Sequence, residues 1–294
     1  MKPEFLERAD RIAADNISSQ QQILKDTLDL LSAFSLDDIS NTSFVRDLKS
    51  LSTAISNAQS QMSAVSNMCR FVISASDRMN HEEICAYLKS LRDKIGIAPS
   101  QAARHASGLI ANGKNYATIS QSEFVLQTFE RAAHEGKDAT VFVMESRPLF
   151  EGRQTARALM KMGHRAVLVS DASIGFFINE IDSALVGADS ILSDGTLINK
   201  IGSYPLAACC AAAKKNFYTV TSILKYDSEK SPETFINKEE SANEIYANPE
   251  FEVRNFYFDK VDPEFITAIV TEIGSISPLS GLYELNSMMR ELYG

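Results

Sequence analysis

The apolar residues of this chain change their spacing near residue 110, and that change limits the folds that the chain can adopt. From Phe5 to Ser107 they recur every three to four positions, which is typical of amphipathic helices. Helical patterns also occur later, at Thr155–Met162 and Leu206–Lys214. After residue 114, however, short apolar runs that are typical of buried strands stand between the helical segments: residues 117–120, 140–144, 166–169, 184–186 and 217–221.

The order of these patterns predicts an α/β protein. Nearly continuous apolar strands that alternate with helices indicate a mainly parallel sheet with helices on both faces. We therefore predict an all-helical N-terminal domain over residues 1–110 and an α/β domain over residues 111–294. In such sheets ligands bind beyond the carboxyl ends of the strands, so functional side chains are expected in the loops after residues 144, 169 and 186.

The composition argues against several classes of protein. The chain has 294 residues, of which 29 are basic and 38 are acidic, so its net charge of -9 opposes direct binding to a nucleic-acid backbone. The charged N-terminus and the absence of a long apolar run predict a cytoplasmic protein without a membrane span. Four cysteines and four histidines without metal-ligand spacing predict reduced thiols, no metal and no cofactor. Cys209 and Cys210 are expected in a helix core.

Polar residues follow two of the expected strands. The strand at 140–144 continues into a loop that holds Arg147, Glu151 and Gly152, and the strand at 184–186 continues into Gly187-Ala188-Asp189. Asn199 and Lys200 follow shortly after, in what we interpret as a loop ahead of a helix. Carboxylates, an amide and basic groups at one edge suit a small anionic molecule with hydroxyls, and a phosphate could use the helix N-terminus there.

Five ordered segments carry a resemblance to a known superfamily: MESRPLFEGRQTARAL, SDASIGFFI, VGADSILSDGTLINKIGSYPLA, FYTVTSILK and VRNFYFDKVDPEFITAIVTEIG. They resemble the regulatory (alpha, beta, delta) subunits of translation initiation factor 2B and the methylthioribose-1-phosphate and ribose-1,5-bisphosphate isomerases. The resemblance implies a helical N-terminal domain followed by a Rossmann-like domain. That second domain, residues 111–294, would carry the ligand pocket and the interface of a homodimer.

The resemblance also implies roles for individual residues. Asp189 stands at the catalytic aspartate of the isomerases, and Asn199 and Lys200 stand at their ligand-binding Asn-Lys pair. Glu151 replaces a glutamine in the loop that also holds Arg147 and Gly152. Ser120 stands where the isomerases carry a cysteine, and a hydroxyl is a far weaker acid than a thiol.

Each of these positions also has a structural interpretation. Asp189 is typical of a turn-capping aspartate after a strand, and Asn199 of a helix N-cap. Arg147 suits a brace for Glu145 or Asp171 as well as it suits a pocket, because a buried arginine usually has a carboxylate partner.

Two arginine positions of the isomerases are also lost, since Ser18-Ser19-Gln20 and Gln61 align with them. These losses favour an archaeal-type regulatory-subunit-like protein that binds the alpha subunit of initiation factor 2. It would sense a sugar phosphate or a nucleoside monophosphate. The alternative is an aldose–ketose isomerase acting on a phosphorylated pentose, with Asp189 as acid–base group and Glu151 or Glu145 in place of the cysteine.

Overall fold

A computed structural model describes residues 1–15, 18–36 and 41–294 of the chain. It forms two compact units. The first comprises Met1–Ile97, Leu224–Tyr226 and Leu285–Gly294, and the second comprises Ala98–Ile223 and Asp227–Glu284. That residues 1–110 and 111–294 fold as separate domains stays a prediction.

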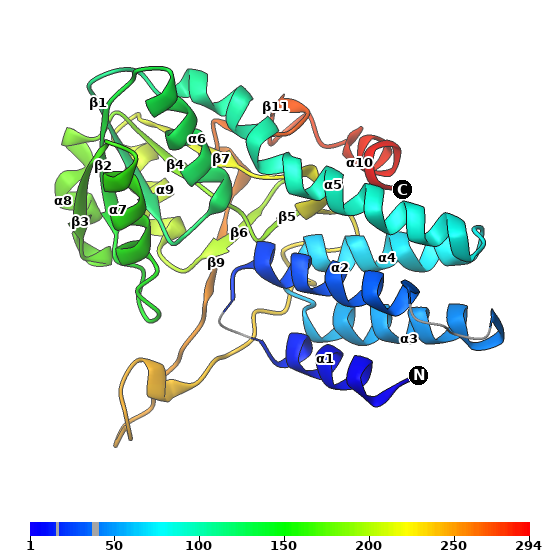
Figure 1. Ribbon diagram of the computed structural model, residues 1–294. Helices are drawn as coiled ribbons and strands as arrows, with labels where there is room; N and C mark the ends of the chain where they lie inside the picture. The colour runs from blue at the N-terminus through cyan, green and yellow to red at the C-terminus, as the bar shows by residue number, and fades with distance from the viewer. Residues whose placement is uncertain (16–17, 37–40) are drawn as a thin grey trace. The chain divides into compact units, whose positions relative to one another are not determined.

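The first unit is helical (Figure 1). Aromatic side chains form part of its core, where the Phe34 ring lies 5.3 Å from that of Phe5 and 5.7 Å from that of Phe44. The C-terminal helix belongs to this unit because Tyr87 Oη and Lys94 Nζ donate to the carbonyls of Tyr293 and Leu292, each at 2.6 Å. Its helices are α1 (Pro3–Ala14), α2 (Gln20–Leu36), α3 (Asn41–Ala58), α4 (Ser63–Ser76), most of α5 (His81–Ala106) and α10 (Leu285–Tyr293).

The second unit is built on a seven-stranded sheet in the order β11-β10-β7-β4-β1-β2-β3. All neighbours are parallel except β10 and β11. The α/β fold with a helical N-terminal region and a mainly parallel sheet is therefore confirmed. The strands are β1 (Lys114–Ile119), β2 (Ala139–Met144), β3 (Arg165–Val169), β4 (Ser183–Val186), β7 (Asn216–Val220), β10 (Ala268–Thr271) and β11 (Gly274–Ile276).

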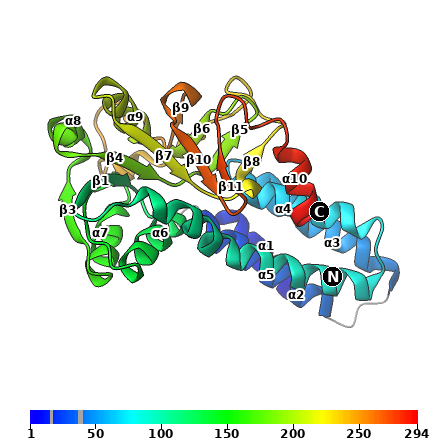
Figure 2. The same cartoon turned by 90° about the horizontal axis from the view of Figure 1, so that it is seen from above.

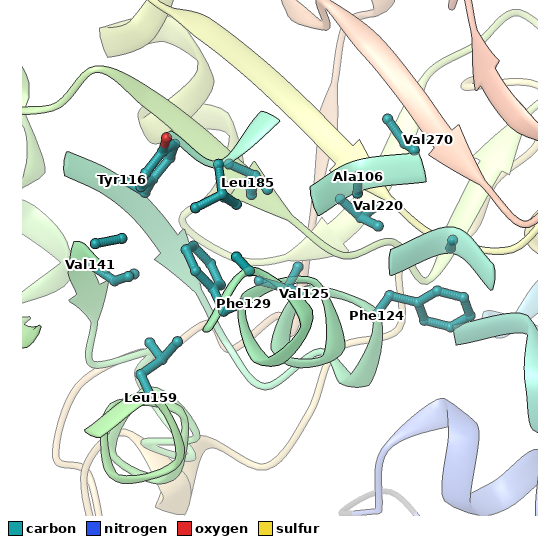
Figure 3. Packing of buried hydrophobic residues seen from close by; sticks show 14 of the residues in the cluster. Ala106, Tyr116, Phe124, Val125, Phe129, Val141, Leu159, Leu185, Val220 and Val270 are labelled. Atoms are coloured by element: carbon teal, nitrogen blue, oxygen red, sulfur yellow. The ribbon is translucent and has the colours of Figure 1, made fainter. Parts of the chain in front are cut away.

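Helices cover both faces of this sheet, with α6 (Glu123–His134) and α7 (Gly152–Lys161) on one side and α8 (Ile174–Phe177) and α9 (Ser203–Ala212) on the other (Figure 2). Side chains alternate between the faces along each strand. Val141 of β2 packs with Phe129 and Leu159 in the core under α6 and α7 (Figure 3). Phe142, the next residue, points to the other face, where the centre of its ring lies 5.5 Å from that of Phe177 in α8.

A small antiparallel sheet follows β4, where the sequence suggested only a loop. Its four strands have the order β8-β5-β6-β9. They are β8 (Tyr226–Asp227), β5 (Ser190–Leu192), β6 (Leu197–Lys200) and β9 (Phe258–Val261), and β6 is antiparallel to both β5 and β9. The expectation of a loop before the helix was wrong. Asn199 and Lys200 lie at the end of a strand, where Asn199 is paired in register with Asp259.

Candidate functional site

The winding of the large sheet reverses next to its central strand. From β1 the chain proceeds outward to β2 and β3, and it then returns to β4 on the other side of β1. In open parallel sheets ligands bind at such a reversal, beyond the carboxyl ends of the strands. The loops after β1 and β4 carry Ser120 and Asp189, so two of the predicted site residues lie at this point.

Ser120 follows β1 in a left-handed backbone conformation, with φ of 63°. Its N–H donates to Ser146 Oγ, and its carbonyl accepts a bond from Thr155 Oγ1, both at 2.7 Å. The two bonds hold the strained backbone in place. The Ser120 hydroxyl has no hydrogen-bond partner among the residues that the structure describes. No neighbouring base is therefore in place to activate it.

The loop after β2 is held by Asp171, whose carboxylate accepts the N–H groups of Ser146 and Arg147 at 2.8 and 2.7 Å. The Arg147 side chain braces neither Glu145 nor Asp171. Its guanidinium instead donates to the Ile245 carbonyl at 3.1 Å.

Gly152 begins α7 at a very close approach to the end of β2. A Cβ atom at this position would lie 1.9 Å from the Met144 carbonyl oxygen. No other residue fits without moving the helix or the strand, so packing explains this glycine. The same approach fixes the residue before it, Glu151, at the edge of the sheet.

Glu151 forms an ion pair with Lys200. Lys200 Nζ lies 2.9 Å from Glu151 Oε1, and the two side chains are 5% and 23% exposed. The second oxygen of this carboxylate, Oε2, is buried and has no hydrogen-bond partner among the described residues. The structure therefore brings together residues from the loop before α7 and from the end of β6, which the sequence had placed separately.

Asn199 and Asp189 lie on the same side of the unit, next to Gly187. Asn199 Nδ2 donates to Ser203 Oγ at 2.8 Å, and the Asp189 N–H donates to the Ile198 carbonyl at 2.8 Å. A Cβ on Gly187 would lie 3.9 Å from Asn199 Oδ1 and 2.6 Å from Ser122 Oγ. The glycine thus allows the loops after β1 and β4 to meet the end of β6, with the half-buried Asp189 beside them.

The N-terminus of α9 is already occupied by a carboxylate. Asp259 Oδ2 accepts the N–H groups of Gly202 and Tyr204 at 2.7 and 3.0 Å. Burial raises the pKa of Asp259, and the backbone N–H bonds oppose that increase. The expectation that a phosphate uses this helix end was wrong, because its N–H groups already have an anionic partner.

A tyrosine and a glutamate that were not among the predicted site residues also belong to this cluster. Lys200 Nζ lies 5.0 Å from the centre of the Tyr257 ring, and Tyr257 Oη lies 2.7 Å from each carboxylate oxygen of Glu244. Tyr257 lies in the last of the five segments that carry the family resemblance, whereas Glu244 lies outside all five, and only the fold brings the two together.

Other expected features can be placed within the described parts of the chain. No group of three or more His, Cys, Asp or Glu side chains there could hold a metal ion. Cys210 is buried and Cys209 partly exposed, and all four cysteines are free. No helix in the same parts has the length and apolar character of a membrane span. Ser18, Ser19, Gln20 and Gln61 lie in the first unit.

Comparison with characterised proteins changes the expected function. Ribose 1,5-bisphosphate isomerase of Archaeoglobus fulgidus is 27% identical over 289 residues, covering 94% of this chain and 90% of that protein. The protein of the same name from Methanocaldococcus jannaschii is 28% identical over 265 residues, covering 85% and 83%. These names support the isomerase alternative and contradict our expectation of a regulatory subunit that binds the initiation factor 2 alpha subunit.

The fold is shared with solved structures of translation initiation factors. The Pyrococcus horikoshii eIF-2B structure superimposes with a TM-score of 0.86 at 23% identity, covering 95% of this chain and 98% of that chain. A tetrameric eIF2B beta-delta complex from Chaetomium thermophilum gives a TM-score of 0.75 at 14% identity, covering 98% and 94%. The model of the Initiation factor 2 subunit family matches residues 16–278. The chain therefore belongs to the Initiation factor 2 subunit family.

Proposed function

We propose that this chain is an aldose–ketose isomerase that acts on a phosphorylated pentose. The observation that carries the proposal is the asymmetry of the Glu151 carboxylate. One oxygen accepts from Lys200 at 2.9 Å, while the other is buried and unpaired among the described residues. Buried carboxylate oxygens normally have partners, so an unpaired one at this edge of the sheet is a candidate for a group on the substrate. The names of the isomerase relatives supply the reaction class.

The reaction moves a hydrogen between C1 and C2 of the sugar and moves the carbonyl in the opposite direction. The substrate is its own oxidant and reductant, so no second substrate or cofactor is needed. Glu151 and Asp189 act as the two acid–base groups, one removing a proton and the other returning one. General acid–base catalysis by a positioned side chain contributes about 10²–10⁴ in rate.

Glu151 is a better replacement for the family cysteine than either alternative. Glu145 is engaged by Arg153, whose Nη2 lies 3.1 Å from its Oε2. Ser120 has a hydroxyl that no described base contacts, and an unactivated hydroxyl is a poor proton carrier. Glu151 alone among the three carries a buried, unpaired oxygen.

Lys200 and Asn199 serve to bind the oxygens of the sugar. Lys200 has two further donor hydrogens besides the one that it gives to Glu151, and Asn199 keeps its Oδ1 as an acceptor. The proposal also includes a cytoplasmic location and a homodimer. Light scattering on a size-exclusion column tests the dimer, and a single peak at 32.4 kDa would contradict it.

The test is an isomerisation assay with ribose 1,5-bisphosphate and methylthioribose 1-phosphate. The wild-type protein is expected to convert one of them. Asp189→Asn and Glu151→Gln each lower turnover by about 100-fold or more, whereas Ser120→Ala lowers it by less than about threefold. A folded wild-type protein that converts neither sugar overturns the proposal.

A further inference from the structure

We infer that Tyr257 is the positioning residue for Lys200, and that Glu244 holds Tyr257 in that role. The segment 241–257, far along the chain from the loops after β1 and β2, is thereby part of the site. What this positioning does for catalysis rests on the proposed function. The arrangement of the side chains does not, and it can be tested separately.

Lys200 is held on two sides. Its Nζ donates to Glu151 Oε1 at 2.9 Å and lies 5.0 Å from the centre of the Tyr257 ring. An ammonium group is attracted to the face of an aromatic ring, and the attraction grows when water is excluded. Lys200 is 5% exposed, so the carboxylate and the ring together fix the direction in which its remaining hydrogens point.

Tyr257 is itself held by the carboxylate of Glu244, which lies at the exposed end of this arrangement. The ring is 7% exposed, and its Oη lies 2.7 Å from both oxygens of Glu244. Burial raises the pKa of Tyr257, and the hydrogen bond to Glu244 raises it further, so the phenol keeps its proton and donates it. Asn255 Nδ2 donates to Glu244 Oε2 at 2.8 Å and so fixes the acceptor.

The segment is tied to the site at a second point. The Arg147 guanidinium, from the loop after β2, donates to the Ile245 carbonyl at 3.1 Å. Asn255 also donates to the Ser241 carbonyl at 2.9 Å, which closes the short helical turn Ala242–Glu244. Glu244 is therefore held at a defined distance from Lys200 by bonds on both sides of it in sequence.

The two middle members of this arrangement, Lys200 and Tyr257, are buried polar groups. Lys200 is 5% and Tyr257 7% exposed. An ammonium group and a phenol are costly to bury, and apolar residues of similar size would stabilise the same packing more simply. Each group instead contacts the next in a line that begins at the site: Glu151, Lys200, Tyr257 and Glu244. These contacts hold the Lys200 ammonium group in one orientation next to Glu151.

The test uses the reactivity of Lys200 itself, so it does not depend on turnover. The native protein is pulsed with N-hydroxysulfosuccinimide acetate at pH 8, and acetylation of each lysine is followed by mass spectrometry. Tyr257→Leu removes the ring and is expected to raise the acetylation rate of Lys200 about tenfold or more. Tyr257→Phe keeps the ring and stays within about threefold of wild type, and Glu244→Gln falls between the two.

Two controls separate a local change from unfolding. Lys225 is 7% exposed and lies in the first unit, so its labelling rises only if the protein opens globally. Tyr283→Leu alters a tyrosine that is 95% exposed and leaves Lys200 as protected as in wild type.

The outcomes distinguish this inference from the proposed function. Equal labelling of Lys200 in Tyr257→Leu and in the wild type overturns the positioning role, whatever the enzyme assay shows. Faster labelling in a protein without isomerase activity leaves the positioning role standing and removes the proposed function. If ribose 1,5-bisphosphate is converted, Tyr257→Leu lowers kcat about tenfold with KM changed less than threefold, and Tyr257→Phe restores most of kcat. Unchanged kcat in Tyr257→Leu contradicts the role.

Discussion

Lys200 at the end of β6 donates to Glu151 Oε1 across 2.9 Å, and this ion pair joins the small antiparallel sheet to the loop before α7. A buried pair gives little net stability when intact, but removal of one partner leaves an uncompensated charge. Because Glu151 is 23% exposed, water reduces that penalty below the value for a fully buried pair.

Glu151→Gln is therefore expected to lower the free energy of unfolding by about 2 kcal/mol. The double variant with Lys200→Met removes both charges and recovers part of the loss, with a coupling of about 1 kcal/mol. Urea unfolding of the four proteins in the cycle measures this coupling. Strictly additive effects of the two substitutions would show that the pair contributes nothing to stability.

Gly152→Ala is expected to be severely destabilising, by about 3 kcal/mol or more, since its Cβ would lie 1.9 Å from the Met144 carbonyl oxygen. Gly96→Ala is the matched control. Gly96 lies inside α5 with no atom within 4 Å of the added Cβ, so alanine there stabilises by about 0.5–1 kcal/mol. Thermal unfolding followed by circular dichroism gives both values. A Gly152→Ala protein as stable as the wild type contradicts the close approach.

Asp259 accepts N–H groups at the N-terminus of α9, so its removal should lower the free energy of unfolding as the loss of a helix cap does. Asp259→Ala lowers the free energy of unfolding by about 1 kcal/mol, and Asp259→Asn, which keeps an acceptor, lowers it by less. The pKa of Asp259 is raised in the folded state, so its folded form binds the proton more tightly than the unfolded chain does. The stability of wild type relative to Asp259→Asn is thus greatest below pH 3.8 and falls as pH rises through the folded pKa. If the stability of wild type relative to Asp259→Asn rose with pH instead, the pKa of Asp259 would be lowered in the folded state, which contradicts this prediction.

The buried thiols are expected to resist alkylation. Burial raises the pKa of Cys69 and of Cys210 to about 12, and only the thiolate reacts. Iodoacetamide at pH 8 should modify the partly exposed Cys85 and Cys209 in the native protein and leave the other two until urea is added. Peptide mapping by mass spectrometry reads each site. Rapid native modification of Cys69 would contradict its burial.

The sequence predicted the fold class because hydrophobic spacing is local. Runs such as 140–144 are apolar throughout because helices cover both faces of the sheet, so such a strand can be recognised from its own residues. The β5–β6 hairpin was missed although Asp194-Gly195, a strong hairpin signal, stands between its strands. Gly195 has φ of 93°, which a tight turn requires. Strands of three and four residues gave too short an apolar pattern to recognise.

The candidate site was predictable only in part, for a physical reason. Asp189, Asn199 and Lys200 belong to a continuous segment that the family resemblance marked. The partners of these residues come from distant segments, and neither the Glu151–Lys200 pair nor the Tyr257 ring over the ammonium can be inferred from local patterns. The predicted phosphate site at the N-terminus of α9 was wrong for the same reason, because the carboxylate that occupies it, Asp259, comes from the distant strand β9.

The most direct test of the proposed function follows ribose 1,5-bisphosphate by phosphorus NMR with wild type, Glu151→Gln and Ser120→Ala. Glu151→Gln matters most, because it keeps a hydrogen-bond acceptor for Lys200 and replaces the carboxylate that carries the proton with an amide. We predict conversion by the wild type and by Ser120→Ala at similar rates, and a loss of about 100-fold or more in Glu151→Gln. Conversion by Glu151→Gln at the wild-type rate, or none by the folded wild-type protein, would contradict the proposed function.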